Sequence, residues 1–164
     1  MAGRITKSED QLKPDARYNN KVLAKFINCL MYDGKKATAQ RVMYDALNIL
    51  KERTQKEKSS GLPENELDVF LKAIENVKPD IEVRSKRIGG ANYQVPMPVN
   101  AKRRQSLAFR WILTATRAGK GKPMANRLAS ELLDACRGEG KSITKKNEVH
   151  RMAEANRAFS HFAR

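Results

Sequence analysis

The sequence contains too few cysteine and histidine residues to build a metal centre. Of its 164 residues, two are Cys and two are His, and Cys29 and Cys136 lie too far apart for the ligand spacing of a structural zinc site. Each cysteine falls within an apolar helical pattern, which predicts a reduced residue in the core of a protein from a reducing compartment. No apolar run approaches the roughly 18 residues of a membrane-spanning helix. We therefore expect no bound metal, no disulfide and no membrane association.

Signatures of catalysis are scarce as well. Gly34 is followed by two lysines but lacks the upstream glycine of a phosphate-binding P-loop. The Gly89-Gly90 pair precedes an extended segment, whereas a dinucleotide-binding motif would open a helix. His150 and His161 lie in a basic helical pattern without an obvious carboxylate partner. Because an active site needs convergent polar groups with shifted pKa values, we expect a protein that is not an enzyme and binds no cofactor.

The N-terminal residues do not form a targeting sequence. Residues 1–12 include Arg4 but no apolar stretch, and they contain two acidic residues, unlike an acid-poor transit peptide. Residues 1–18 are polar and aperiodic, which indicates a flexible basic N-terminal arm. The remaining residues, 19–164, have a length typical of one domain.

Positive charge is abundant and unevenly distributed. The formal net charge is +15 and the pI is about 10.1, an excess that points to nucleic acid or to an anionic membrane surface. Between Lys78 and Lys122 there are eleven Lys and Arg residues but only two acidic residues, so this segment carries +9 of the total. Charge gathered in one segment favours a binding surface over general solubility.

Apolar residues recur at the spacing of one buried helix face along most of the chain. The pattern predicts six helices, and Asn100, with Asn19 or Asn20, can cap two of them. Trp111 lies on an apolar stripe and is predicted to be a core residue. The last helix has few large apolar residues on its apolar face, so we expect that helix to pack against a partner. The predicted ranges are about 21–31, 35–53, 64–77, 101–118, a fifth helix that ends near 137, and 145–162.

Residues 81–98 interrupt the helical pattern and alternate apolar with polar residues on both sides of Gly89-Gly90. This is typical of a β-hairpin, here between the third and fourth helices. A two-residue glycine turn would pair Lys86 with Tyr93 and scatter the apolar residues over both faces. A three-residue loop, 88–90, keeps one face apolar, and we predict this second register, in which Val83 faces Val95, Arg84 faces Gln94 and a cationic face combines Arg84, Lys86, Asn92 and Gln94.

The hairpin is expected to span 81–96, because Pro96 cannot donate to a strand ladder. The predicted architecture is thus mainly α, a six-helix single domain with one protruding hairpin. A basic hairpin on a helical body fits an RNA-binding protein, and it also fits a DNA-architectural protein that inserts a β-arm into the minor groove. An RNA-modifying enzyme is a third alternative, but it would need a cofactor pocket that the sequence does not indicate.

Several runs of the sequence resemble bacterial-type ribosomal protein seven of the small subunit. They are collinear and together extend over nearly the whole chain. The runs are Lys25-Phe26-Ile27-Asn28, Asp33-Gly34-Lys35-Lys36, Glu75-Asn76-Val77-Lys78-Pro79, Glu82-Val83-Arg84-Ser85, Gly89-Gly90-Ala91-Asn92-Tyr93-Gln94-Val95-Pro96, Leu107-Ala108-Phe109-Arg110-Trp111 and Arg151-Met152-Ala153-Glu154-Ala155-Asn156-Arg157-Ala158-Phe159.

The resemblance implies a structural ribosomal protein with a six-helix body and one hairpin. It further implies direct binding to the 3′ major domain of small-subunit ribosomal RNA, early nucleation of the subunit head, and a position near the decoding centre and the exit-site transfer RNA. The implied protein partners are small-subunit proteins nine and eleven, and some family members bind their own messenger RNA. The expected location is a cytoplasmic ribosome, with an organellar ribosome as the alternative.

The implied RNA contacts fall on basic residues, because fixed cations match the phosphates of folded RNA. The chain departs from the family in a longer loop at 54–65, in Lys86 where arginine is common, and in its C-terminal tail, 160–164. The predicted contact residues are Arg4, Lys35, Lys36, Arg84, Lys86, Arg87, Lys102, Arg103, Arg104, Arg110, Lys120, Lys122, Lys145, Lys146, Arg151 and Arg157.

Overall fold

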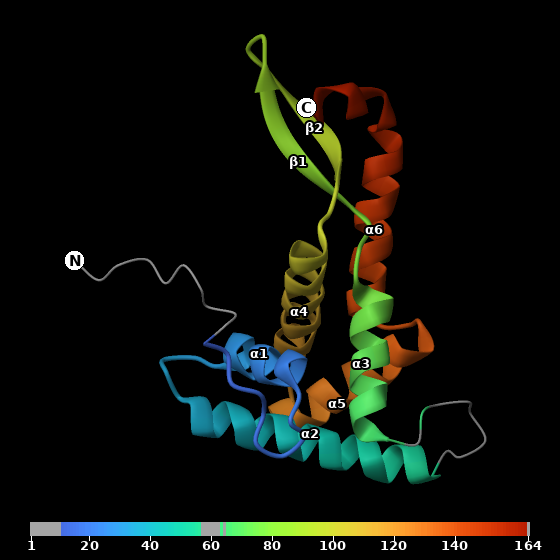
Figure 1. Ribbon diagram of the computed structural model, residues 1–164. Helices are drawn as coiled ribbons and strands as arrows, with labels where there is room; N and C mark the ends of the chain where they lie inside the picture. Colours follow the sequence, from blue (N-terminus) through green and yellow to red (C-terminus); the bar gives the residue numbers. More distant parts are fainter. Residues whose placement is uncertain (1–10, 57–62, 64, 164) are drawn as a thin grey trace.

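The computed structural model describes residues 11–56, 63 and 65–163, so Arg4 lies outside the described residues. The protein is mainly helical, with one antiparallel two-stranded hairpin between the third and fourth helices (Figure 1), as predicted. The helices are α1 (Lys21–Leu30), α2 (Lys36–Lys56), α3 (Glu66–Val77), α4 (Ala101–Ala118), α5 (Met124–Arg137), α6 (Lys141–Ala155) and the 3-10 helix η1 (Arg157–Ala163), and the strands are β1 (Ile81–Ile88) and β2 (Ala91–Pro98).

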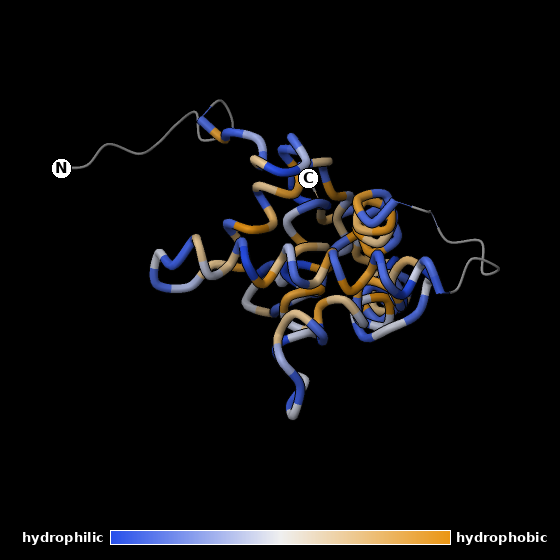
Figure 2. Tube along the Cα trace, turned by 90° about the horizontal axis from the view of Figure 1, so that it is seen from below, coloured by the Kyte–Doolittle hydropathy of each residue, from blue (hydrophilic) through white to orange (hydrophobic). Residues whose placement is uncertain are grey.

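The hydrophobic core lies between helices α1 to α5. Phe26 of α1 makes edge-to-face contacts with Phe70 of α3 and Phe109 of α4, at centroid distances of 5.3 and 5.2 Å. All three rings are buried. In Figure 2, hydrophobic and hydrophilic residues alternate along the helices of this body, as expected for helices that bury one face. The core therefore joins α4, which follows the hairpin, to the rest of the helical body.

Two helix starts confirm the sequence analysis, and one core assignment is wrong. Asn20 and Asn100 cap α1 and α4 through side-chain oxygens that accept backbone N–H groups. Cys136 is buried as predicted, but Cys29 is exposed. Cys29 follows buried Ile27 by two residues, a rotation of roughly 200° about the helix axis, so it faces away from the core.

The hairpin closes with the shorter of the two turns considered. Ile88 lies opposite Ala91, so Gly89 and Gly90 form a two-residue turn and the predicted three-residue loop is wrong. Both glycines have positive φ, 57° and 89°, as a type I′ turn requires, and that turn matches the right-handed twist of the strands. Few residues of the strands are buried, so apolar alternation does not decide the register.

The register also changes which side chains share a face of the hairpin. Cross-strand neighbours lie on the same face, and Arg84 lies opposite Val95 while Lys86 lies opposite Tyr93. The predicted face that combined Arg84 and Lys86 with Asn92 and Gln94 is therefore wrong. The two amides lie on the other face of the hairpin, because successive residues of a strand alternate.

The prolines near the end of β2 do not stop the strand. Pro96 and Pro98 both lie within it, so the predicted end at 96 is wrong. Beyond the last pair, the Val99 N–H donates to the Asp80 carbonyl oxygen at 3.0 Å. Hydrogen-bonded pairs alternate along an antiparallel ladder, so both prolines occupy the intervening positions, where a missing N–H costs no ladder bond.

The last predicted helix, 145–162, is two elements in the structure. Helix α6 begins four residues earlier, where the Ser142 N–H donates to buried Glu131 of α5 at 2.8 Å. It ends at Ala155, and η1 then turns back toward the hairpin (Figure 1). Phe159 and Phe162 of η1 lie 5.1 and 5.6 Å from the Tyr93 ring. The thin stripe of α6 thus packs beside the hairpin of the same chain.

The described part of the predicted N-terminal arm lies against the helical body. Asp15 is 5% exposed and accepts hydrogen bonds from the Tyr44 hydroxyl at 2.7 Å and the Tyr18 N–H at 3.2 Å. Burial and the bond to Asp15 raise the pKa of Tyr44 to about 12. Residues 1–10, with Arg4, lie outside the described residues, so the predicted flexibility of the arm stays a prediction.

Candidate nucleic-acid interface

Two arginines at the start of α4 brace the base of the hairpin. Arg103 Nε donates to Glu82 Oε2 at 3.1 Å, and Arg104 Nε donates to the Pro79 carbonyl oxygen at 3.0 Å. Arg104 also forms an ion pair with Asp80. These contacts explain why the hairpin leaves the body directly over α4. Both arginines were predicted as RNA contacts, and the structure shows that each also makes contacts within the fold.

Glu82 is the centre of a small ionic cluster. The residue is 7% exposed and pairs with Arg84 on its own strand as well as with Arg103. A carboxylate that is almost fully buried is tolerated here because two guanidinium groups pair with it. Guanidinium carries five N–H donors, and the Arg84 and Arg103 side chains keep 54% and 38% of their surface exposed. Both therefore retain donors that can face a phosphate.

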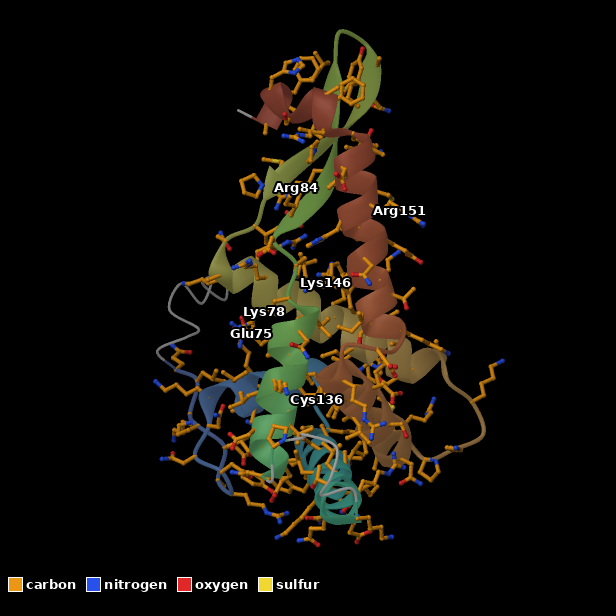
Figure 3. All side chains as sticks on the ribbon, turned by 90° about the vertical axis from the view of Figure 1, so that its right-hand side faces the viewer. Glu75, Lys78, Arg84, Cys136, Lys146 and Arg151 are labelled. Carbon is orange, nitrogen blue, oxygen red and sulfur yellow. The ribbon has the colours of Figure 1, made fainter. Side chains whose placement is uncertain are left out.

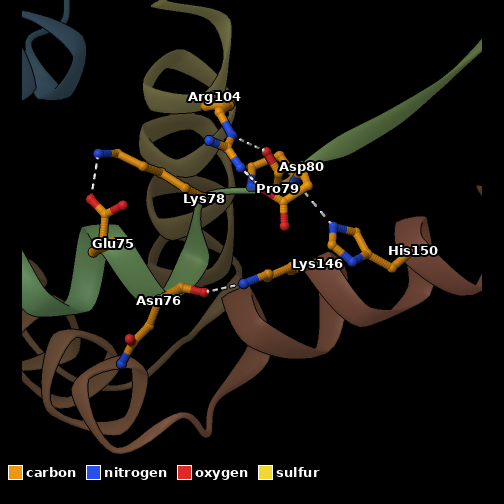
Figure 4. Close-up of polar contacts among 8 residues, drawn as sticks. All are labelled: Glu75, Asn76, Lys78, Pro79, Asp80, Arg104, Lys146 and His150. Carbon is orange, nitrogen blue, oxygen red and sulfur yellow. Dashed lines mark hydrogen bonds and ion pairs between the residues drawn. The ribbon is translucent and has the colours of Figure 1, made fainter. Parts of the chain in front are cut away.

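The junction between α3 and β1 is tied to α6 (Figure 4). Lys146 Nζ donates to the Asn76 carbonyl oxygen at 2.7 Å, and the Asp80 N–H donates to His150 Nε2 at 3.3 Å. The Asn76 side chain in turn donates to the carbonyl oxygens of Ala135 and Cys136, both at 3.0 Å. These bonds hold the C-terminal ends of α3 and α5 together and tie the α3–β1 junction to the middle of α6, so the start of the hairpin is fixed relative to these helices.

Burial and the neighbouring Arg104 lower the pKa of Lys146. Figure 3 shows Lys146 between α6 and α3, whereas Arg151 projects from the outer side of α6. Both residues were predicted to contact RNA, yet only Arg151 is exposed. Lys146 therefore acts mainly as a brace within the fold.

We predict that His150 makes stability depend on pH. Burial and Lys146 lower the pKa of His150 below its ordinary value of 6.5, so the unfolded chain takes up a proton at higher pH than the folded chain does. The stabilising effect is complete above the unfolded pKa and is lost as pH falls through the folded one. The urea midpoint should decline between pH 7.5 and 5, and less so in His150→Gln. An equal decline in the two proteins would contradict this assignment, and His161→Gln is the matched control.

Eight predicted contact residues are exposed and have no ion pair or side-chain hydrogen bond to the described part of the chain. They form three groups: the start of α2 and the residue before it with the turn after α4, the middle of α4, and the hairpin tip with α6 and η1. Because no carboxylate of the described residues neutralises them, their charge is available to a partner. These eight unpaired cations are Lys35, Lys36, Lys120, Lys122, Arg110, Arg87, Arg151 and Arg157.

The remaining predicted contacts are exposed but have partners. Lys86 Nζ donates to the Phe162 carbonyl oxygen at 2.8 Å, which ties the hairpin to η1. Lys145 pairs with Glu148 at 3.0 Å, and Lys102 is exposed at the start of α4. Sequence reasoning missed Arg117, whose Nη2 donates to the Leu30 carbonyl oxygen at 3.1 Å and whose guanidinium covers Tyr32. The position of Arg117 in its predicted helix did not indicate that contact.

Two features are absent from the described residues. None of the helices there is both long enough and apolar enough to cross a membrane. Within the same residues, no three His, Cys, Asp or Glu side chains gather as a possible metal-binding group.

Comparison with known proteins identifies the family. The model of ribosomal protein S7p/S5e matches residues 2–157. The small ribosomal subunit protein uS7 of Rhodopirellula baltica is 57% identical over 161 residues, which cover 98% of this chain and 99% of the relative. The proteins of the same name from Magnetococcus marinus and Salinibacter ruber are 48% identical over 162 residues (99% of each chain) and 50% identical over 150 residues (92% and 91%). This chain belongs to the ribosomal protein S7p/S5e family.

Proposed function

We propose that this protein is a non-catalytic structural constituent of the small ribosomal subunit that binds the 3′ major domain of its ribosomal RNA. The observation that carries the proposal is the full-length similarity to proteins named as small ribosomal subunit proteins. The unpaired cations support it, because exposed charge without internal partners is what phosphate binding requires. The described residues that provide this charge belong to several helices and the hairpin, which suits a folded RNA recognised by shape.

The proposal includes a role in assembly and further partners. Early binding to the 3′ major domain would nucleate the subunit head, and small-subunit proteins nine and eleven would be neighbours there. The hairpin and the C-terminal residues would face the exit-site transfer RNA, and the same basic surfaces could bind messenger RNA. The rigid junction of α3, α5 and α6 supports this arrangement, because it fixes the hairpin relative to the helical body.

The RNA assignment is tested by binding to separate domains of small-subunit RNA. The protein is titrated with a fragment of the 3′ major domain and, in parallel, with a 5′ domain fragment of equal length. Because electrostatic attraction is the same for equal numbers of phosphates, only shape-specific recognition favours the first fragment. We expect at least a ten-fold preference for the 3′ major domain. Equal affinities would contradict the proposal.

The hairpin is predicted to serve transfer RNA more than assembly. Replacing Arg84 and Arg87 with alanine should weaken retention of exit-site transfer RNA several-fold, because both side chains are exposed on the hairpin. Incorporation of the protein into reconstituted subunits should change little. Arg87→Ala alone is the sharper variant, since Arg84 also pairs with Glu82. Normal retention together with failed assembly would reject this division of roles.

A further inference from the structure

Tyr32 is an aromatic residue whose side chain is largely exposed to solvent. It lies in the turn between α1 and α2 and is 64% exposed, the largest value among the exposed large hydrophobic residues of the described chain. The turn itself is tightly held: the Lys35 N–H donates to the Tyr32 carbonyl oxygen at 2.9 Å, and Asp33 and Gly34 have positive φ. The ring is therefore presented to solvent from a fixed backbone.

Arg117 of α4 covers the Tyr32 ring. Its guanidinium carbon lies 4.1 Å from the ring centroid, and its Nη2 donates to the Leu30 carbonyl oxygen at 3.1 Å. Two contacts thus hold the guanidinium over the ring before any ligand arrives. Arg117 pairs with no carboxylate of the described residues, so its charge is not neutralised. A tyrosine and an arginine held together in this way form a cationic platform.

A pocket of about 230 Å³ opens beside this platform. Its walls are mostly apolar and come from α1, α2, α4 and α5, with Lys35 and Arg117 as the cations that line it. Met124 forms the wall on α5, and the turn that joins it to α4 carries the unpaired Lys120 and Lys122. An apolar space lined by two cations, with a basic turn next to it in the chain, suits a ligand that has one flat apolar part and one anionic part.

We propose that Tyr32, Arg117 and Lys35 form a binding site for one unstacked nucleotide of the RNA. The base stacks on the tyrosine–arginine platform at the mouth of the pocket, and the adjoining phosphate meets Lys35 and the basic turn. Stacking on aromatic and guanidinium planes is how proteins hold single-stranded bases within folded RNA. The inference rests on the proposed RNA-binding function and adds a defined base-binding site to it. An apolar peptide would use the pocket but would leave the cations without partners.

The test compares Tyr32→Leu and Tyr32→Phe for binding to the 3′ major domain fragment over a range of salt concentrations. Tyr32→Leu should lower affinity about ten-fold, as expected for the loss of one stacked base. The slope of log K against log salt should not change, because the ring carries no charge. Tyr32→Phe keeps the ring and should bind like the wild type. Since the ring is exposed, neither variant should change the urea midpoint.

Lys35→Gln completes the design, because it removes the cation that meets the phosphate and leaves the platform in place. It should lower affinity and also reduce the salt slope by about 0.7–0.9. Chemical probing of the RNA should show one nucleotide that loses protection with Tyr32→Leu while the rest of the footprint is kept. Wild-type affinity and an unchanged footprint for Tyr32→Leu would overturn the base site and leave the proposed function intact. Failure of the wild type to prefer this RNA would overturn both.

Discussion

Replacement of Arg110, Lys120 and Lys122 with glutamine is expected to weaken binding to the 3′ major domain by about 100-fold at physiological salt. All three side chains are exposed and have no partner within the described chain. Each phosphate contact contributes about 0.7–0.9 to the slope of log K against log salt. The triple variant should therefore lose about two units of slope, which a titration at four or five salt concentrations measures.

The matched control removes the same charge from another part of the surface. Lys51, Lys56 and Lys72 are exposed on α2 and α3, and none of them is a predicted contact residue. Their replacement with glutamine should lower affinity by only a few-fold. If both triple variants weaken binding equally, the attraction depends on net charge alone, and the three predicted positions have no special role. Unfolding curves of both variants should match the wild type.

The second large effect is expected in the core. Phe26→Ala should reduce the free energy of unfolding by about 3–5 kcal/mol, the range for removal of a buried phenylalanine ring. Phe26 is fully buried and contacts both Phe70 and Phe109, so its loss leaves a cavity where α1, α3 and α4 meet. Urea unfolding followed by circular dichroism measures this change.

Phe26→Leu separates the volume of the side chain from its aromatic contacts. Leucine refills most of the cavity, so the loss should be clearly smaller than for alanine. A loss below about 1 kcal/mol for alanine would mean that the three helices do not meet at this ring as described. Binding to RNA by the folded fraction should be unchanged, because Phe26 is 0% exposed and cannot contact a ligand.

The sequence predicted the helical body well, because its helices bury one apolar face. The period of 3.6 located α1 to α5 closely, and Asn20 and Asn100 marked two starts through their capping side chains. The prediction that Cys29 lies in the core is wrong, because membership in an apolar run does not decide which face of a helix a residue occupies. The break at Ala155 was also missed: the aromatic residues that follow pack on Tyr93, a contact that helical periodicity does not contain.

The hairpin was predicted, but its register was not. Alternation decides a register only where one face is buried, and here the buried strand residues are Glu82, Val95 and Pro96. The backbone preference of Gly89 and Gly90 decided the turn instead. An apolar pattern does not predict the register of a strand pair that is largely exposed to solvent.

For the candidate site, the sequence predicted a set of basic residues but not their pairing within the fold. The contact of Glu82 with Arg103 joins residues 21 positions apart and follows only from the packing of the hairpin over α4. Similarly, the Tyr32 and Arg117 platform joins α4 to the turn after α1. Such pairs cannot be found from charge runs, because their members come from different elements.

The central claim is tested most directly by competition between RNA and DNA. The full chain is bound to the 3′ major domain fragment and challenged with duplex DNA of equal length at increasing salt. Purely electrostatic binding loses affinity for both ligands alike, whereas shape recognition of RNA persists. We predict that the RNA complex survives the competitor at physiological salt. Equal competition by duplex DNA would contradict the ribosomal RNA assignment and would favour a DNA-architectural protein with a β-arm.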